Sequence, residues 1–218
     1  MSIGLLGNKI GMTQIFDVKG EIIPVTVIKS GPCYVTQIKS DENCGYNAIQ
    51  VGYLEMSSPS NLKKMTKPEL GHFHSVNVSP FRYLKEYRIK KKEEAENMFL
   101  SYPIGQKISV EIFEIGQHVN VTGFTIGKGN AGNVKKNHFH RGAMTHGSKH
   151  HRAQGSLGSG TTPGRVFPGK RMSSQSGMEK RTILGLEIID IDKNENLIVV
   201  KGAIPGKSGN LVSITAKK

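Results

Sequence analysis

The amino-acid sequence predicts a mainly β protein, a barrel or a sandwich, that carries one long irregular basic segment. Short runs rich in Val, Ile and aromatic residues are separated by Gly, Pro or polar residues, as in an all-β domain. Residues 127–181 have scattered apolar side chains that follow neither a two-residue nor a 3.6-residue period. The 218 residues include 30 Lys and Arg against 17 Asp and Glu, a surplus that favours a polyanionic partner, most often nucleic acid.

Two patterns identify the clearest strands. In 107–113, Ile108, Val110 and Ile112 alternate with polar residues, as in a strand with one buried face. In 183–191 nearly every position is apolar, as in a strand covered on both faces. Polar residues follow this run and lead to the next one, so the two runs predict a hairpin. The remaining predicted strands are residues 3–6, 22–28, 35–38, 48–53, 119–126, 197–200 and 211–215.

Local signals add detail to this β pattern. Pro24 predicts that the strand at 22–28 lies at a sheet edge, because proline donates no backbone hydrogen bond. The apolar phase slips across Gly123, which predicts a bulge there. Thr66 followed by Glu69 matches a capping box, and Pro68 suits a first helical turn, so we predict a short helix over 67–74.

The positive charge is concentrated in one segment. Residues 127–181 contain eleven Lys and Arg, five His and eleven of the 26 Gly, against Glu179 as the single acidic residue. The rest of the chain has 19 basic and 16 acidic residues, the balance of an ordinary domain. A segment this long without a core is uncommon in a compact domain unless it is functional or disordered. Glycine allows close approach to phosphates, and Arg, Lys and His bind phosphates or stack on bases, so we expect this segment to bind RNA.

An enzymatic reading rests on one motif. Residues 127–132 match G-x-G-x-x-G after a predicted strand, the pattern of a dinucleotide-binding turn. The residues that follow show no amphipathic helical pattern, and no acidic residue stands about twenty positions further on to bind a ribose. No pattern of a catalytic nucleophile or of paired acids accompanies the motif. We therefore expect no catalytic residue, no cofactor and no small-molecule substrate.

Metal binding is a weaker alternative for the histidines of the basic segment. His138, His140, His146, His150 and His151 lie close together in the sequence, but no Cys or Asp accompanies them. Carboxylates that usually orient metal-bound imidazoles are missing. The two cysteines, Cys33 and Cys44, form neither a disulfide framework nor a zinc motif, and we interpret both as reduced and structural. These observations lead us to expect no bound metal. No apolar run approaches the length of a membrane span, so we also expect no membrane partner.

Four segments resemble one known family, the universal ribosomal protein three of the large subunit. They are residues 3–13 (IGLLGNKIGMT), 66–73 (TKPELGHF), 161–172 (TTPGRVFPGKRM) and 200–206 (VKGAIPG). The resemblance implies a six-stranded translation-protein-type β-barrel with a small α/β insert and a long irregular basic extension. On this basis the barrel comprises residues 1–54, 103–126 and 182–218, the insert with a short helix 55–102, and the extension 127–181.

The same resemblance implies a function. The family is a structural constituent of the large ribosomal subunit, binds its ribosomal RNA, acts early in assembly and has no catalytic side chains. The extension would reach toward the peptidyl transferase centre, with its tip at about 154–162. Ribosomal RNA and neighbouring large-subunit proteins are the implied partners. The candidate RNA-binding residues are Lys128, Lys135, Lys136, His138, His140, Arg141, Lys149, His150, His151, Arg152, Gly155, Ser156, Gly158, Ser159, Thr161, Arg165, Lys170, Arg171, Lys180 and Arg181.

One position departs from the common bacterial pattern. Bacterial members of the family commonly carry a glutamine that can be methylated where this chain has Thr161, so we expect that modification to be absent. The sequence of residues 160–166 is similar to that of cyanobacterial and plastid members. This similarity predicts a ribosome in the plastid stroma or the bacterial cytoplasm. The alternative function, supported by the same charge, is a free RNA chaperone or nucleic-acid-binding regulator.

Overall fold

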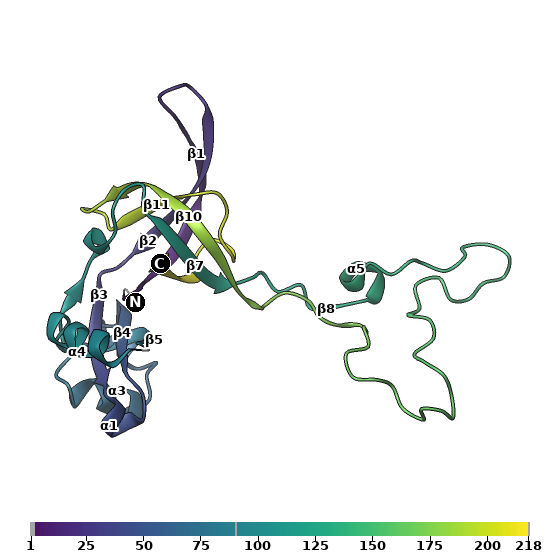
Figure 1. Ribbon diagram of the computed structural model, residues 1–218, viewed down its shortest axis with the longest axis horizontal. Helices are drawn as coiled ribbons and strands as arrows, with labels where there is room; N and C mark the ends of the chain where they lie inside the picture. Colours follow the sequence, from purple (N-terminus) through teal and green to yellow (C-terminus); the bar gives the residue numbers. More distant parts are fainter. Residues whose placement is uncertain (1–2, 90, 218) are drawn as a thin grey trace. The chain divides into compact units, whose positions relative to one another are not determined.

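The computed structural model describes residues 3–89 and 91–217. The chain divides into two compact units, Met1–Phe124 with Lys180–Lys218, and Thr125–Glu179. The second unit is called the extension below, and Figure 1 shows its long loops in green. Most of the regular structure belongs to the first unit.

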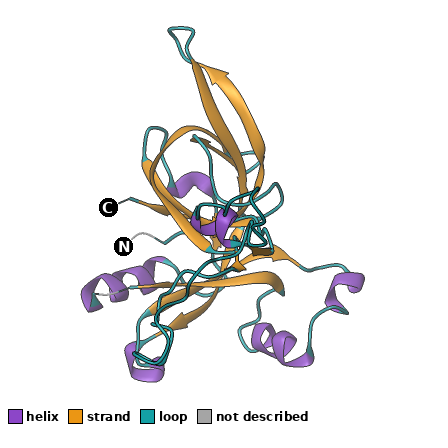
Figure 2. Ribbon diagram, turned by 90° about the vertical axis from the view of Figure 1, so that its right-hand side faces the viewer, coloured by secondary structure: helices purple, strands orange, loops and turns teal. Residues whose placement is uncertain are grey.

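A closed six-stranded barrel forms the centre of the first unit (Figure 1). Its strands follow the order β1-β12-β7-β10-β11-β2, and all neighbours are antiparallel. They are β1 (Leu5–Phe16), β2 (Ile22–Ser30), β7 (His118–Phe124), β10 (Lys180–Asp192), β11 (Leu197–Lys201) and β12 (Leu211–Ala216). The predicted mainly β class and its six-stranded barrel are confirmed. The outer parts of β1 and β2 continue beyond the barrel as a hairpin (Figures 1 and 2).

Alternation along the strands fills the barrel. On β7, Val119 and Val121 are fully buried, while Asn120 and Thr122, which alternate with them, are partly exposed. Ile188, Ile198 and Ile214 are likewise fully buried on β10, β11 and β12. Inward residues at every second position are what the pleat of a strand requires, so the barrel encloses a packed aliphatic core.

A second sheet, β5-β4-β3-β6, lies beside the barrel with short helices around it (Figure 2). Its strands are β3 (Cys33–Lys39), β4 (Ala48–Glu55), β5 (Phe81–Arg88) and β6 (Lys107–Ile108). The helices are α1 (Asp41–Cys44), α2 (Pro59–Leu62), α3 (Lys67–His74) and α4 (Lys92–Ser101). The assignment of 33–54 to the barrel is therefore wrong. Both edges of β2 are already paired, with β1 and β11, so the chain that leaves β2 finds no free barrel edge and starts a new sheet.

Three local predictions need correction. The predicted strand 107–113 is only the two-residue β6 followed by a 3-10 helix, Val110–Ile112. No register shift occurs at Gly123, because it occupies the inward position after Val121; the irregularity lies on β10, between Ile183 and Leu186. Pro24 belongs to a strand inside the closed barrel, yet the β11 pairing ends at Val25, so its missing N–H falls just beyond that ladder.

Other predictions from local signals are confirmed. β10 and β11 form the predicted hairpin. Helix α3 has the predicted bounds, Lys67–His74, and the Glu69 carboxylate accepts hydrogen bonds of 2.8 Å from both the backbone N–H and the hydroxyl of Thr66. Of the cysteines, Cys33 is buried, and burial raises the pKa of its thiol to about 12, whereas Cys44 is exposed and so does not pack as predicted.

The capping box makes a stability prediction. Thr66→Ala removes the N-cap side chain of α3 and is expected to lower the free energy of unfolding by about 1 kcal/mol in denaturant titrations. Ser40→Ala is the matched control, because Ser40 is the N-cap of α1 but makes no side-chain capping bond. Equal losses in the two variants would show that the capping box contributes nothing.

Candidate nucleic-acid interface

A two-stranded stem begins and ends the extension. The backbone N–H of Thr125 donates to the Glu179 carbonyl at 2.9 Å, and that of Lys128 donates to the Ser176 carbonyl at 2.8 Å. The ladder continues through β8 (Asn130–Ala131) and β9 (Ser174–Gln175). The stem thus brings residues that are about fifty positions apart in the sequence onto one ribbon.

A buried asparagine fixes the chain beyond the stem. Asn133 begins the short helix α5 (Asn133–Asn137) and is only 3% exposed. Its amide nitrogen donates to Gln154 Oε1 at 3.1 Å, and its Oδ1 accepts a 2.8 Å bond from Asn137 Nδ2. Asn137 Nδ2 also donates to the Met172 carbonyl at 3.2 Å. Amide side chains therefore hold three distant pieces of the extension together where apolar residues are few.

The histidine-rich part forms a small turn. The backbone N–H of Gly142 donates to the His151 carbonyl at 2.9 Å, and His151 Nδ1 lies 2.9 Å from the Ala143 carbonyl oxygen. Between these residues, His146 adopts a left-handed backbone conformation with φ near 56°. Within the described residues, no group of three or more His, Cys, Asp or Glu is placed to hold a metal ion. The structure does not gather the five histidines into one cluster.

Residues 161–172, one of the four segments that carry the family resemblance, lie in an exposed loop. The N–H of Gly164 donates to the Gly160 carbonyl at 3.3 Å and closes a turn around Pro163. Just after it, the Arg165 guanidinium lies 5.7 Å from the centre of the Phe167 ring. All residues from 158 to 171 are exposed. The loop presents backbone N–H groups, hydroxyls and cations outward with little internal packing.

Eighteen of the twenty predicted contact residues are exposed, including all those named at the tip. Lys136 is partly buried, and its Nζ donates to the Gln175 carbonyl at 2.7 Å and to the Ser174 hydroxyl, so it supports the stem. His151 is partly buried in the turn described above. Lys180 and Arg181 are the first residues of β10 and belong to the barrel unit rather than to the extension.

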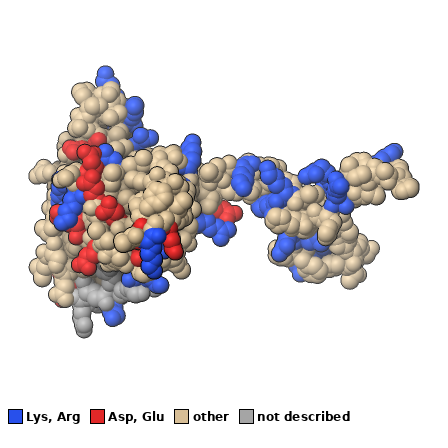
Figure 3. Space-filling view, turned by 90° about the horizontal axis from the view of Figure 1, so that it is seen from above, with Lys and Arg blue, Asp and Glu red and all other residues tan. Residues whose placement is uncertain are grey.

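The charge of the extension is unbalanced over its whole length. Residues 125–179 include nine Lys and Arg, and Glu179 at the end of the stem is their only carboxylate. Figure 3 shows Lys and Arg along the extension, with red atoms only near its base. A chain with this composition has a strong positive field and only one acidic group of its own against it. Phosphates are the natural counter-charge.

Residues 127–132 do not form a dinucleotide-binding turn. They belong to the two-stranded stem, and the helix that follows, α5, has only five residues. A dinucleotide site needs a strand, a tight turn and a longer helix within a parallel βαβ unit. Neither α5 nor the role of Asn133 is predicted from the sequence, because a single Asn carries no periodic or charge signal.

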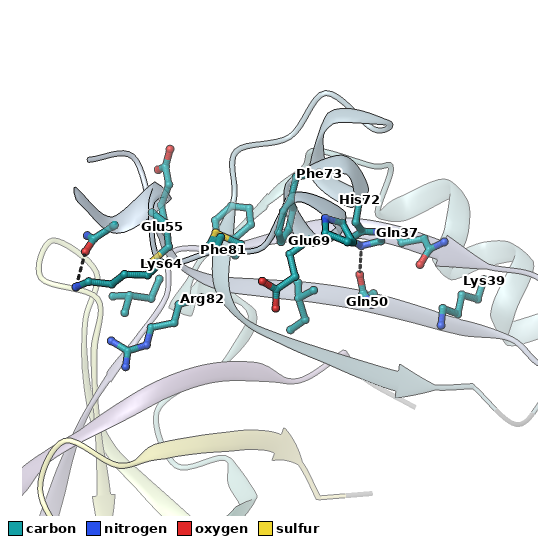
Figure 4. A pocket seen from close by; sticks show the side chains of 16 residues that line it. Gln37, Lys39, Gln50, Glu55, Lys64, Glu69, His72, Phe73, Phe81 and Arg82 are labelled. Atoms are coloured by element: carbon teal, nitrogen blue, oxygen red, sulfur yellow. Dashed lines mark hydrogen bonds between the residues drawn. The ribbon is translucent and has the colours of Figure 1, made fainter. Parts of the chain in front are cut away.

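A separate pocket of about 1030 Å³ lies on the insert, between α3 and the second sheet (Figure 4). Its lining has both charge signs, with Glu55 and Glu69 alongside Lys64 and Arg82. His72 Nε2 lies 2.9 Å from Gln50 Oε1 at its wall. Mixed charges give this pocket no preference for a polyanion. In the part of the chain that is described, no helix is long and apolar enough to cross a membrane.

Comparison with known proteins gives a consistent family. Residues 88–198 match the family described as Ribosomal protein L3. The chain is 54% identical over 214 residues to the large ribosomal subunit protein uL3c of Phaeodactylum tricornutum, covering 98% of each chain. It is 52% identical over 215 residues to the large ribosomal subunit protein uL3 of Picosynechococcus sp., covering 98% of this chain and 96% of that protein. The protein uL3c of Guillardia theta is 50% identical over 214 residues, covering 98% of this chain and all of that protein.

Proposed function

Because the chain belongs to the Ribosomal protein L3 family, we propose that it is a structural constituent of the large ribosomal subunit that binds ribosomal RNA through its extension. The predicted family is confirmed by near full-length relatives at about half identity. Those relatives carry the names uL3 and uL3c, which supports a ribosome of the plastid stroma or the bacterial cytoplasm.

One observation supports RNA binding above the others. In residues 125–179 only Ala131 and Asn133 are buried, while nine Lys and Arg share the segment with a single carboxylate. So little buried surface provides few apolar contacts to stabilise the order of a segment this long. Phosphate contacts would supply the missing stabilisation, and exposed N–H and hydroxyl groups suit them.

The family supports finer steps of the same proposal. The extension enters the RNA of the subunit and reaches toward the peptidyl transferase centre, and the protein acts early in assembly. Peptide bond formation belongs to the RNA, and the chain contributes no catalytic group. Ribosomal RNA and neighbouring large-subunit proteins are its partners.

Crosslinking tests the proposal directly. Photoreactive groups placed within 155–163, in intact large subunits, are expected to crosslink to large-subunit ribosomal RNA. The protein should also stay with the subunit in high salt, since enclosed contacts are screened less than exposed ones. A chaperone or regulator would instead exchange freely, with affinity falling steeply as salt rises. Recovery of most of the protein free of ribosomal particles after gentle lysis would contradict the structural role.

A further inference from the structure

A row of hydroxyl groups crosses the boundary between the second sheet and the barrel. Tyr87 Oη on β5 lies 2.8 Å from Ser213 Oγ on β12. Ser213 is paired with Thr122 on β7, and Thr122 is paired with Thr182 on β10. The hydroxyls of the two threonines lie 2.9 Å apart. Four hydroxyl side chains from four strands thus follow one line across the outer face of the barrel.

A lysine stands on the same strand face at each end of this row. Lys85 precedes Tyr87 by two residues on β5, and Lys180 precedes Thr182 by two residues on β10. Residues two apart on a strand share a face, so both lysines flank the hydroxyl row. Lys85 is partly buried, with its Nζ 5.6 Å from the centre of the Tyr87 ring, while Lys180 and Thr182 are exposed.

Lys85 gains no compensation from the acidic residue next to it. Glu86 points to the other face of β5, where one of its oxygens lies 2.5 Å from Lys39 Nζ and the other accepts the Tyr46 hydroxyl at 2.9 Å. Burial, together with the smaller effect of the nearby charge of Lys180, lowers the pKa of Lys85 to about 8. The free protein therefore holds two neighbouring cations, one of them partly removed from water, which is an unfavourable arrangement.

An anion would relieve this arrangement. We propose that Lys85, Lys180 and the Thr122–Thr182 hydroxyl pair bind one phosphate group of an RNA strand, as a contact made by the barrel unit itself. Two cations and hydroxyl donors are the groups that proteins use for nucleic-acid phosphates. The identification of the phosphate as part of an RNA rests on the proposed function. Lys85 was absent from the sequence-predicted contacts because its strand, β5, was not predicted.

Full-length Lys85→Met tests the site, with Lys63→Met, an exposed lysine of the insert, as the matched control. Binding of a large-subunit ribosomal RNA fragment is measured over a series of salt concentrations. Loss of one phosphate contact to a duplex reduces the slope of log K against log salt by about 0.9, which corresponds to an affinity about eightfold weaker at 0.1 M salt. Lys63→Met should leave both quantities unchanged. Lys180→Met, at an exposed position, should repeat the loss without depending on how Lys85→Met folds.

The substitution that weakens RNA binding should stabilise the free protein. A purely structural role of Lys85 would not produce this combination. The pKa of Lys85 is lower in the folded chain than its ordinary 10.5, so the unfolded chain binds more protons between about pH 8 and 10.5. The charge on Lys85 thus lowers the free energy of unfolding of the free protein by its full amount below about pH 8. This destabilising contribution disappears as the pH rises to 10.5. Lys85→Met should raise the melting temperature of the free protein at pH 7, and the gain should shrink over that window.

The possible outcomes separate the two proposals. If Lys85→Met and Lys180→Met bind RNA with unchanged affinity and slope while Arg165→Glu binds weakly, the phosphate site is refuted and the proposed function stands. If the wild-type chain does not bind ribosomal RNA at all, the proposed function fails with it. If Lys85 and Lys180 bind polyglutamate more tightly than RNA, their partner is an acidic protein. That outcome also overturns the phosphate site.

Discussion

Arg165→Glu is expected to reduce incorporation of the chain into large ribosomal subunits by roughly 100-fold or more, the equivalent of about 3 kcal/mol. Arg165 is exposed in the free protein, on a loop that is one of the segments carrying the family resemblance. Enclosed by RNA, its guanidinium would face phosphates in a region with little water. A carboxylate there would lose the contact and add a repulsion that salt barely screens. Incorporation is measured as the ratio of tagged variant to wild-type protein in purified subunits.

Lys63→Glu provides the comparison for this charge reversal. Lys63 is an exposed residue of the insert, where a single charge is worth about 1 kcal/mol at most, so its incorporation should fall by less than about fivefold. Arg165→Lys keeps the charge but loses the planar fork and the contact with Phe167, so it should fall between the two. Equal effects of Arg165→Glu and Lys63→Glu would contradict an enclosed extension.

Elements set by neighbouring residues could be predicted from the sequence. The bounds of α3 follow from Thr66, Pro68 and Glu69, all within one turn of its start. The β10–β11 hairpin follows from two apolar runs and the polar turn between them. Such signals are strong because the interacting groups are adjacent in the chain and need no knowledge of tertiary contacts.

Elements set by distant contacts could not be predicted. The alternation in 107–113 predicts a strand, but only Lys107 and Ile108 pair with another strand, β3. Residues Val110–Ile112 form a 3-10 helix instead. Strand β5 was missed because its outward face mixes Arg, Leu and Glu, and its burial depends on a second sheet that the sequence did not reveal. In both cases the free edge available for pairing decides the structure.

The candidate interface divides in the same way. Its charge is a property of composition, so the cationic residues of the extension could be named without a structure. Their roles were less accessible: Lys136 directs its amino group to the stem, and Asn133 organises three pieces of chain without any charge. Lys85 belongs to a site that exists only because β5 lies beside the barrel. Composition thus indicates a ligand class, while topology decides which side chains meet it.

Gly177→Ala is expected to open the stem of the extension and to reduce incorporation strongly, while the melting temperature of the barrel changes little. A Cβ on Gly177 would lie 2.0 Å from the Ile126 carbonyl oxygen, and the residue has φ near 71°. The atoms that this Cβ meets belong to the backbone of the opposite strand and cannot rotate away as a side chain could, so the two strands of the stem must separate. The fully buried aliphatic residues that stabilise the barrel all belong to the first unit, which is why its unfolding serves as the internal control.

Gly129→Ala separates the clash from the backbone conformation. Gly129 lies in the same stem with φ near 66°, but a Cβ there meets no atom within 4 Å. It should therefore incur only the cost of a left-handed alanine, about 1 kcal/mol. A much larger incorporation defect for Gly177→Ala than for Gly129→Ala would mean that the RNA requires an ordered stem. Equal defects would mean that RNA shapes the stem as it binds, and that the charge of the extension alone is sufficient to bring it into the subunit.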